Sequence, residues 1–423
     1  MKLLDSDFTD TGAGGRLTAP ASKSAFWSSG HRPTLIAAFL YFDLAFMVWV
    51  LLGPLAPEIA KDLHLGPAQK GLMVATPTLA GAILRLVVGL LADRIGPKRT
   101  GSIGQVIVIA GLLGAWLMGV HSFAGTLALG CVLGFAGASF AVALPLASRW
   151  YPPEHQGKAM GIAGMGNSGT VLAALFAPML AKAFGWNAVL GLVCIPLAVV
   201  LALYTVMAKD APGRPAPKPL TAYLEPLRHA DAWWFMLFYG VTFGGFSGLA
   251  SSLTIYFTDQ FALSTVTAGY CTAACVFAGS LVRPVGGAVA DRIGGVAALT
   301  GVYMVAALAL VGVTLSAGNL PASLGCFVAA MLALGTGNGA VFQLVPQRFG
   351  KEIGIVTGLV GMAGGIGGFY LASSLGFARQ LTGSFGPGFL TFAGLALVAL
   401  AALSLVKRTW RTRWDAAAAG VRI

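Results

Sequence analysis

The sequence predicts an all-α membrane protein with twelve transmembrane helices in two pseudo-symmetric six-helix halves. Three observations support this fold class. The 423 residues are 57% hydrophobic and 10% charged, with a mean hydropathy of +0.81, whereas a soluble protein carries about 25% charged residues. Apolar runs of about 20 residues, enough to cross a bilayer core, recur along the chain. Finally, several patterns of the first half return in the second.

The apolar runs are continuous rather than alternating, which indicates helices that satisfy their own backbone in lipid. We expect twelve spans, at about 33–56, 70–91, 101–121, 124–147, 159–182, 187–207, 232–257, 263–289, 296–316, 322–345, 353–376 and 386–406. With the amino terminus inside, most of the 27 Lys and Arg residues lie in cytoplasmic segments, as the positive-inside rule requires. The expected location is therefore the inner membrane, with both termini cytoplasmic.

A proline-rich inner segment divides the chain into domains. We expect a cytoplasmic tail over 1–32, a six-helix half over 33–207, a cytoplasmic linker over 208–231, a second half over 232–407 and a short tail over 408–423. Because the segment after the last span is only about 17 residues long, we do not expect a nutrient sensor with an appended signalling domain.

The formal net charge of +12 belongs to loops that face an anionic leaflet, so we expect lipid and not nucleic acid as a partner. The five cysteines fall within predicted spans and no histidine cluster accompanies them. We therefore expect no metal site, no cofactor and no catalytic dyad, which argues against an enzyme. The expected oligomeric state is a monomer.

Internal repeats support a duplicated six-helix unit. Arg85 precedes "DRIG" at 93–96, and Arg283 precedes "DRIG" at 291–294, an offset of 198 residues. The stretches "GIAGMGN" from 161 and "GLVGMAG" from 358 repeat at an offset of 197. Parallel halves of this kind are typical of alternating-access transporters.

The stretch "GLLADRIGPKR" at 89–99 resembles the signature loop between helices 2 and 3 of the major facilitator superfamily. Glycines permit its tight turn, and the Asp and Arg side chains connect neighbouring helix ends. The second half keeps the acidic and basic pair but lacks the trailing basic residues. We expect a conformational latch formed by Gly89, Asp93, Arg94, Gly96, Asp291 and Arg292.

Arg85 and Arg283 each lie eight residues before an inner turn, which places them about 12 Å deep, near the membrane midplane. An arginine at that depth costs about 2.5–3.5 kcal/mol or more. One interpretation is that helix carbonyls or carboxylates satisfy both. The other is that they face one central cavity and hold an anion, because a guanidinium donates two parallel hydrogen bonds and keeps its charge.

Aromatic and amide side chains lie at a similar depth in other spans, namely Phe140, Asn167, Tyr239 and Asn338. Rings of this kind would sandwich a small flat anion while the arginines and amides bind its oxygens. The glycines around Asn167 and those that begin at 358 create smooth helix faces for close approach. Gly164 and Gly361, from these two stretches, complete the candidate substrate site.

The motifs "GIAGMGNSGT", "GLVGMAGGIGGFY", "LGTGNGAVFQLVP" and "RWYPPEHQGKAMG" are similar to those of the nitrate/nitrite porter family of the major facilitator superfamily. The resemblance implies nitrate and nitrite as substrates. It also implies that nitrate is contacted at Arg85, Arg283, Phe140, Asn167, Tyr239 and Phe243.

Coupling is expected at Asp43, a carboxylate about 16 Å deep in the first span. An inward-negative potential opposes anion entry by about 2.3 kcal/mol per charge per 100 mV, so nitrate import needs a coupled ion. The hypothesis is proton symport through Asp43. The alternatives are a permanently paired Asp43, exchange of nitrate for nitrite, and a facilitator for a larger organic anion with a wider cavity.

Overall fold

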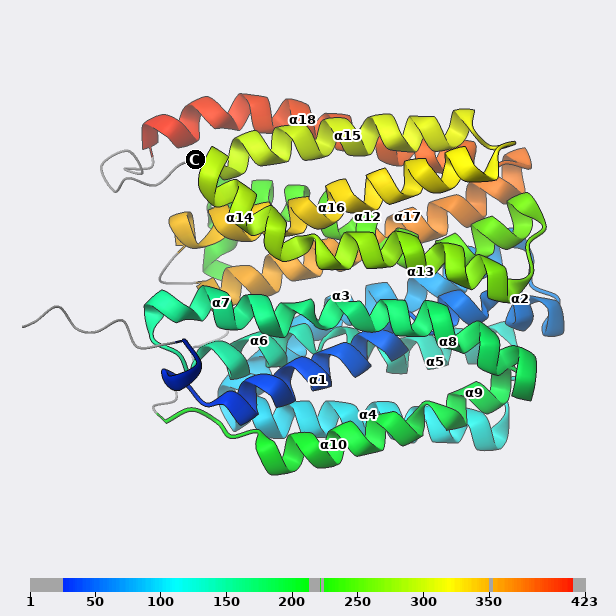
Figure 1. Ribbon diagram of the computed structural model, residues 1–423, viewed down its shortest axis with the longest axis horizontal. Helices are drawn as coiled ribbons and strands as arrows, with labels where there is room; N and C mark the ends of the chain where they lie inside the picture. Colours follow the sequence, from blue (N-terminus) through cyan, green and yellow to red (C-terminus); the bar gives the residue numbers. More distant parts are fainter. Residues whose placement is uncertain (1–25, 213–220, 222–223, 350–352, 414–423) are drawn as a thin grey trace, which may run out of the picture.

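The computed structural model describes residues 26–212, 221, 224–349 and 353–413. All regular structure in these ranges is helical, and twelve continuous or interrupted helices are long and apolar enough to cross a membrane. Figure 1 shows them running side by side along the long axis of the molecule. The predicted all-α, twelve-span fold class is thereby confirmed.

A short helix, η1 (Phe26–Ser28), precedes the first span. The first six spans comprise α1 (Arg32–Trp49), α2 (Leu52–Asp62), α3 (Pro67–Ile95), α4 (Pro97–Met118), α5 (Phe123–Gly137), α6 (Phe140–Ser148), α7 (Pro153–Gly164), η2 (Met165–Ser168), α8 (Gly169–Phe184), α9 (Trp186–Leu192) and α10 (Cys194–Met207). The second six comprise α12 (Ala230–Phe261), α13 (Thr265–Leu281), α14 (Arg283–Ile293), α15 (Gly295–Leu315), α16 (Leu320–Phe349), α17 (Ile353–Thr382) and α18 (Gly386–Arg413), preceded by η3 (Glu225–Arg228).

Several spans differ from the sequence prediction because they are longer and interrupted. They are longer because helical hydrogen bonding continues into polar ends that hydropathy does not detect. Three interruptions lie about four residues before a proline: α1 gives way to α2 before Pro54, α9 to α10 before Pro196, and α13 to α14 before Pro284. Proline has no N–H for the carbonyl four residues earlier and its ring crowds that carbonyl, so the helix bends there.

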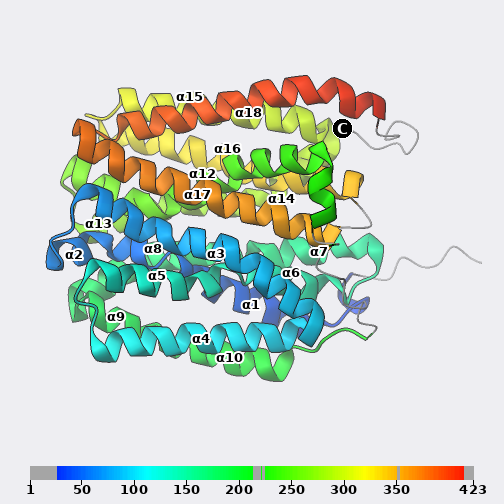
Figure 2. The ribbon, with the colours of Figure 1, turned by 180° about the vertical axis from the view of Figure 1, so that it is seen from behind.

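The described chain begins and ends at the same end of the bundle, on the left in Figure 1. We call this the terminal end and the opposite one, where α2 meets α3, the distal end; Figure 2 shows both from behind. Two equivalent turns lie near the terminal end, at Gly96 and Gly294, with φ of 97° and 92°. Glycine is needed at each because this backbone conformation is strained for other residues.

The two halves meet where α3 packs along α17, α2 against α12 and α8 against α13. Near the distal end the backbones touch, since a Cβ added to Gly71 would lie 2.9 Å from the Cα of Gly376. Near the terminal end, a Cβ added to Gly161, Gly354 or Gly358 would meet nothing within 4 Å. The halves are therefore packed tightly at the distal end, while the glycine-rich parts of α7 and α17 have free space beside them.

Candidate functional site

The side chain of Arg85 extends from the middle of α3 to the boundary between the halves and is 1% exposed. Its Nε donates to the carbonyl of Gly137 at 3.1 Å, and its Nη1 donates to the carbonyl of Gly361 in α17. The remaining nitrogen, Nη2, is buried and has no hydrogen-bond partner. Carbonyls thus satisfy part of this guanidinium, and one N–H group stays available for a ligand.

Arg283 begins α14 and approaches the same region from the second half. Its Nη2 donates to the hydroxyl of Tyr239 at 3.4 Å, and its Nη1 is buried without a partner. Among the described residues, no carboxylate forms an ion pair with either arginine. Within these residues no ion pair therefore neutralises either guanidinium, and each group has an unused donor in a region of low polarity.

Aromatic rings surround the two guanidinium groups. The guanidinium carbon of Arg85 lies 5.2 Å from the ring centroid of Phe243 and 5.5 Å from those of Trp49 and Phe140. The guanidinium carbon of Arg283 lies 5.9 Å from the same Phe140 ring. Ring faces carry partial negative charge and stabilise cations at such distances, so Phe140 helps to hold both arginines.

A second aromatic group continues this frame from the second half. The rings of Tyr239 and Phe243 are stacked 5.1 Å apart at 7°. Phe342 of α16 meets Tyr239 edge-on at 4.9 Å and lies 5.9 Å from the guanidinium carbon of Arg283. The stack needs a glycine behind it, because a Cβ at Gly364 would lie within 2.9 Å of both rings.

Sequence reasoning missed Trp49 and Phe342 as members of this cluster. Phe342 follows Asn338 by one helical turn within a motif already singled out, and the i, i+4 spacing was the signal that could have found it. Trp49 carried no such signal. Its position follows from the bond that its Nε1 donates to the carbonyl of Pro77 at 2.7 Å, which ties α1 to α3.

Asn167 lies in η2, where the fifth span changes from α-helix to 3-10 helix. Its carbonyl accepts from Ser280 Oγ at 3.5 Å, one turn before Arg283, so it lies at the boundary of the halves. Its side-chain Oδ1 is buried without a partner. One turn earlier, Gly164 is itself buried, yet a Cβ added there would meet nothing within 4 Å. This stretch presents an amide oxygen without a partner beside unfilled space.

The other predicted contacts lie close to the cluster. Asn338 of α16 is 1% exposed and its Oδ1 also has no hydrogen-bond partner. The next residue, Gly339, packs on the backbone of Arg283. Gly361 reaches the site through its carbonyl, and a Cβ there would lie 3.5 Å from Arg85 Nη1 and 3.7 Å from a Phe140 ring carbon.

Asp43 is buried in α1 at 7% exposure and is not a partner of either arginine. Its Oδ1 accepts a hydrogen bond of 2.6 Å from Ser168 Oγ, the residue that follows Asn167. The two segments are close because Gly169 packs directly on the backbone of Asp43. The carboxylate of Asp43 therefore contacts the residue next to Asn167, the candidate amide ligand.

The latch residues differ between the halves. In the first, Asp93 of α3 forms an ion pair of 3.0 Å with Arg149, at the end of α6. Gly89 lies one turn earlier, its Cα facing Ala141. The turn at Gly96 leads to Lys98, whose backbone N–H donates to Asp210 at 2.9 Å. These contacts tie α3, α6 and the end of α10 together.

In the second half Asp291 and Arg292 are exposed. Arg348, the counterpart of Arg149, pairs at 2.5 Å with Asp231 of α12. The other carboxylate oxygen of Asp231 accepts from Trp410 Nε1 at 2.8 Å. The two halves therefore use different acidic residues for this connection.

Comparison with known proteins shows the family of the chain. Residues 37–372 match the family model described as Major Facilitator Superfamily. The chain is 35% identical to a Mycobacterium tuberculosis protein named "Probable nitrate/nitrite transporter NarK2". The match covers 88% of this chain and 95% of that protein. It is 32% identical to the "Nitrite extrusion protein" of Bacillus subtilis, in a match that covers 83% of this chain and 88% of that protein.

A solved structure of a bacterial homolog of the human lysosomal transporter Spinster has a TM-score of 0.69 with this chain. The likeness covers 90% of this chain and 97% of that one, at 18% identity, and shows the shared fold. The matches agree with the expectation of a transporter rather than an enzyme. The motifs, the family model and the relatives show that the chain belongs to the nitrate/nitrite porter family of the major facilitator superfamily.

Proposed function

We propose that the chain transports nitrate and nitrite across the inner membrane by alternating access. The observation that carries the proposal is the pair of guanidinium groups at the boundary of the halves, each with one buried nitrogen that lacks a hydrogen-bond partner. A planar oxyanion supplies acceptors for both nitrogens and neutralises their charge. The names of several relatives, which refer to nitrate and nitrite, support the same substrate class.

In this proposal Arg85 and Arg283 bind the oxygens of the anion from opposite halves. Phe140 and the stacked rings of Tyr239 and Phe243 enclose its plane. The Nδ2 groups of Asn167 and Asn338 donate to oxygens that the arginines leave free, while Gly164 and Gly361 leave room for the anion. Rings that lie only 4.9–6.1 Å apart leave little space for a larger organic anion.

The proposed orientation places the terminal end in the cytoplasm and the distal end outside. The halves over 33–207 and 232–407 move as units, the linker over 208–231 connects them, and the tails over 1–32 and 408–423 are cytoplasmic. The excess of Lys and Arg at the terminal end supports this orientation. The functional unit is a monomer in lipid.

For direction and coupling, we propose nitrate import driven by protons through Asp43. The supporting observation is the bond between Ser168 and Asp43, next to Asn167. A protonated carboxyl accepts hydrogen bonds more weakly, so proton uptake would loosen the contact between α1 and η2 where the anion binds. The charge of the proton would also offset the membrane potential that opposes nitrate.

The second candidate is exchange of nitrate for nitrite. A Thermus thermophilus relative is named "Probable nitrate/nitrite antiporter NarK1", at 30% identity over 81% of this chain and 84% of that one. The carboxylate of Asp43 already has a hydroxyl donor, and two permanently charged arginines suffice to carry one anion in each direction without protons.

Counterflow in proteoliposomes tests both candidates. Purified protein is reconstituted, and nitrate uptake is measured with internal nitrite, with an imposed acid-outside pH gradient, or with neither. Symport predicts accumulation driven by the pH gradient alone, and exchange predicts uptake only with internal nitrite. Uptake in neither condition, from protein that remains folded, would contradict nitrate/nitrite transport.

A further inference from the structure

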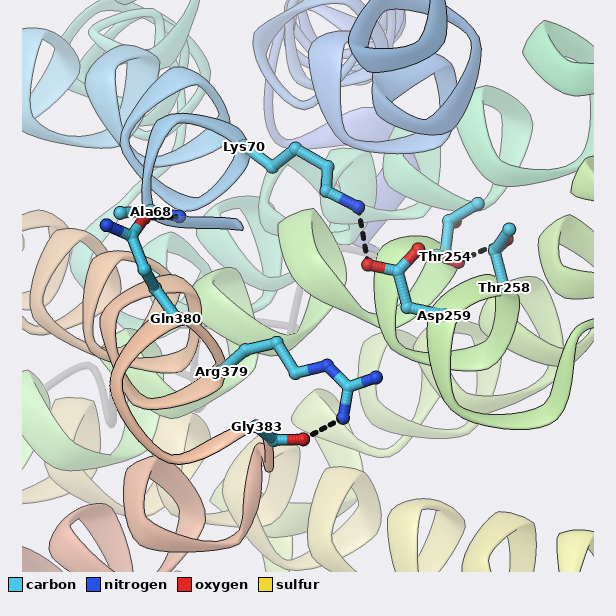
Figure 3. Close-up of polar contacts among 8 residues, drawn as sticks. All are labelled: Ala68, Lys70, Thr254, Thr258, Asp259, Arg379, Gln380 and Gly383. Carbon is cyan, nitrogen blue, oxygen red and sulfur yellow. Dashed lines mark hydrogen bonds and ion pairs between the residues drawn. The ribbon is translucent and has the colours of Figure 1, made fainter. Parts of the chain in front are cut away.

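The distal end of the bundle holds a set of polar contacts that join one half to the other (Figure 3). Lys70, in the first turn of α3, forms an ion pair of 2.5 Å with Asp259 near the end of α12. The backbone N–H of Ala68 donates to Gln380 of α17 at 3.1 Å. We call these contacts, together with the bond from Thr265 of α13 to Glu58 of α2 at 2.7 Å, the distal lock.

The central ion pair is well shielded, because the side chains of Lys70 and Asp259 are 14% and 22% exposed. Arg379 lies near it in Figure 3, but its guanidinium donates to the carbonyl of Gly383 in its own segment. Removal of one charge from a shielded pair leaves the other desolvated and unpaired. The remaining charge then favours any arrangement in which water reaches it.

Ion pairs elsewhere among the described residues have a different role. Arg149 with Asp93 lies within the first half, and Arg348 with Asp231 lies within the second. Both are near the terminal end, where Gly161 and Gly354 have open space beside them. A charge pair that joins the halves is thus found at the distal end, where the backbones of α3 and α17 also touch.

We infer that the Lys70–Asp259 pair holds the distal end closed, and that it must break each time this end opens to admit or release an anion. The inference rests on the proposed function for the identity of the anion, but not for the motion. In the closed state the pair contributes to packing between the halves. In the open state each charge is hydrated, so loss of the pair shifts the equilibrium between the two states toward the open one.

Ser252 is a suitable reporter of opening. It lines the same crevice as Lys70 and Asp259 and is 5% exposed, so a cysteine at this position is shielded while the end is closed. The experiment measures the rate at which a membrane-impermeant maleimide modifies Ser252→Cys in reconstituted full-length protein. The same chain without this substitution gives the background from the native cysteines.

The variants are Lys70→Met, Asp259→Asn and the exchange of charges Lys70→Asp with Asp259→Lys. We expect each single variant to raise the modification rate about tenfold, and the exchanged pair to return it to within about threefold of the parent. The single variants change the local charge in opposite directions, which has opposite effects on thiolate formation. A rise in both therefore reports opening and not thiol chemistry.

Lys182→Met is the matched control, since it removes an exposed positive charge from the end of α8 outside the lock. It should leave the modification rate unchanged. The inference is overturned if both single variants stay at the parent rate, or if the exchanged pair is as reactive as they are. Modification needs no nitrate, so a chain that opens as expected but carries no nitrate would contradict the proposed function alone.

Discussion

Arg85 in α3 donates a hydrogen bond to the backbone carbonyl of Gly361 in α17, and this bond crosses the boundary between the two halves. The residue that we propose as an anion ligand is therefore also a contact between the units that must move. An anion that binds the free Nη2 of Arg85 would act on this contact directly, because it shares the same guanidinium plane. Substrate binding and movement of the halves are then linked through a single side chain.

The identity of the cations at this boundary is the first testable feature. Arg85→Lys and Arg283→Lys keep the charge but lose the planar pair of donors. Each charge-assisted hydrogen bond contributes about 1.5–3 kcal/mol, so we expect nitrate uptake to fall about 100-fold in each variant. Uptake by proteoliposomes gives the rate, and gel filtration verifies folding. Near-normal uptake in both variants would falsify the site assignment.

Gly364 allows the stack of Tyr239 and Phe243 to lie against α17. A Cβ at this position would be 2.8 Å from Tyr239 and 2.9 Å from Phe243, so Gly364→Ala must displace the rings at a cost of about 1–3 kcal/mol. We expect the apparent affinity for nitrate to fall about tenfold, measured as KM for uptake. Gly394→Ala, which has open space around it, is the control and should behave like the parent. Equal KM values in all three proteins would contradict a role for the stack in binding.

Asp43→Asn separates the two coupling modes. The amide keeps a hydrogen-bond acceptor for Ser168 but takes up no proton, so we expect nitrate accumulation under an imposed pH gradient to disappear. Exchange against internal nitrite should continue, because the arginines are intact. Asp62→Asn, a carboxylate change at the distal end, serves as the control. Unchanged response to the pH gradient in Asp43→Asn would rule out this residue as the proton carrier.

The difference between the two latch sequences gives a fourth prediction. Asp93 pairs with Arg149 at about one-third exposure, so Asp93→Asn should lower stability by about 0.5–1 kcal/mol and slow transport. Asp291 is exposed, so Asp291→Asn should change neither quantity. Thermal unfolding and uptake rates of the two variants test this difference. Equal losses in both would show that the two aspartates act alike.

Much of the architecture could be predicted because it depends on local composition. Span number follows from apolar runs that must match the bilayer, and the offset of 198 residues between Arg85 and Arg283 indicates the duplication. Depth could be estimated from helical rise, which grouped the arginines with Phe140 and Tyr239. The interruption at η2 was not predicted, although the prolines at 54, 196 and 284 are visible in the sequence and account for others.

Contacts between distant segments were beyond prediction. The repeat suggested that Asp291 would act like Asp93, yet Arg348 pairs with Asp231 of α12. The link between Lys70 and Asp259, which are 189 residues apart in the chain, gave no pattern to detect. The contact between the Trp49 ring and Arg85, which lie in different spans, likewise gave no pattern in the sequence.

The sequence by itself determined the membrane-spanning class, the two related halves and the residue types available at the midplane. These follow from hydrophobicity and helical geometry, which act within one segment at a time. Only the tertiary structure decided which faces meet, which guanidinium nitrogens remain unpaired and which charges join the halves. Those properties depend on helix rotation and crossing in a packed bundle, where glycine positions along α17 set how closely α3 and α12 approach.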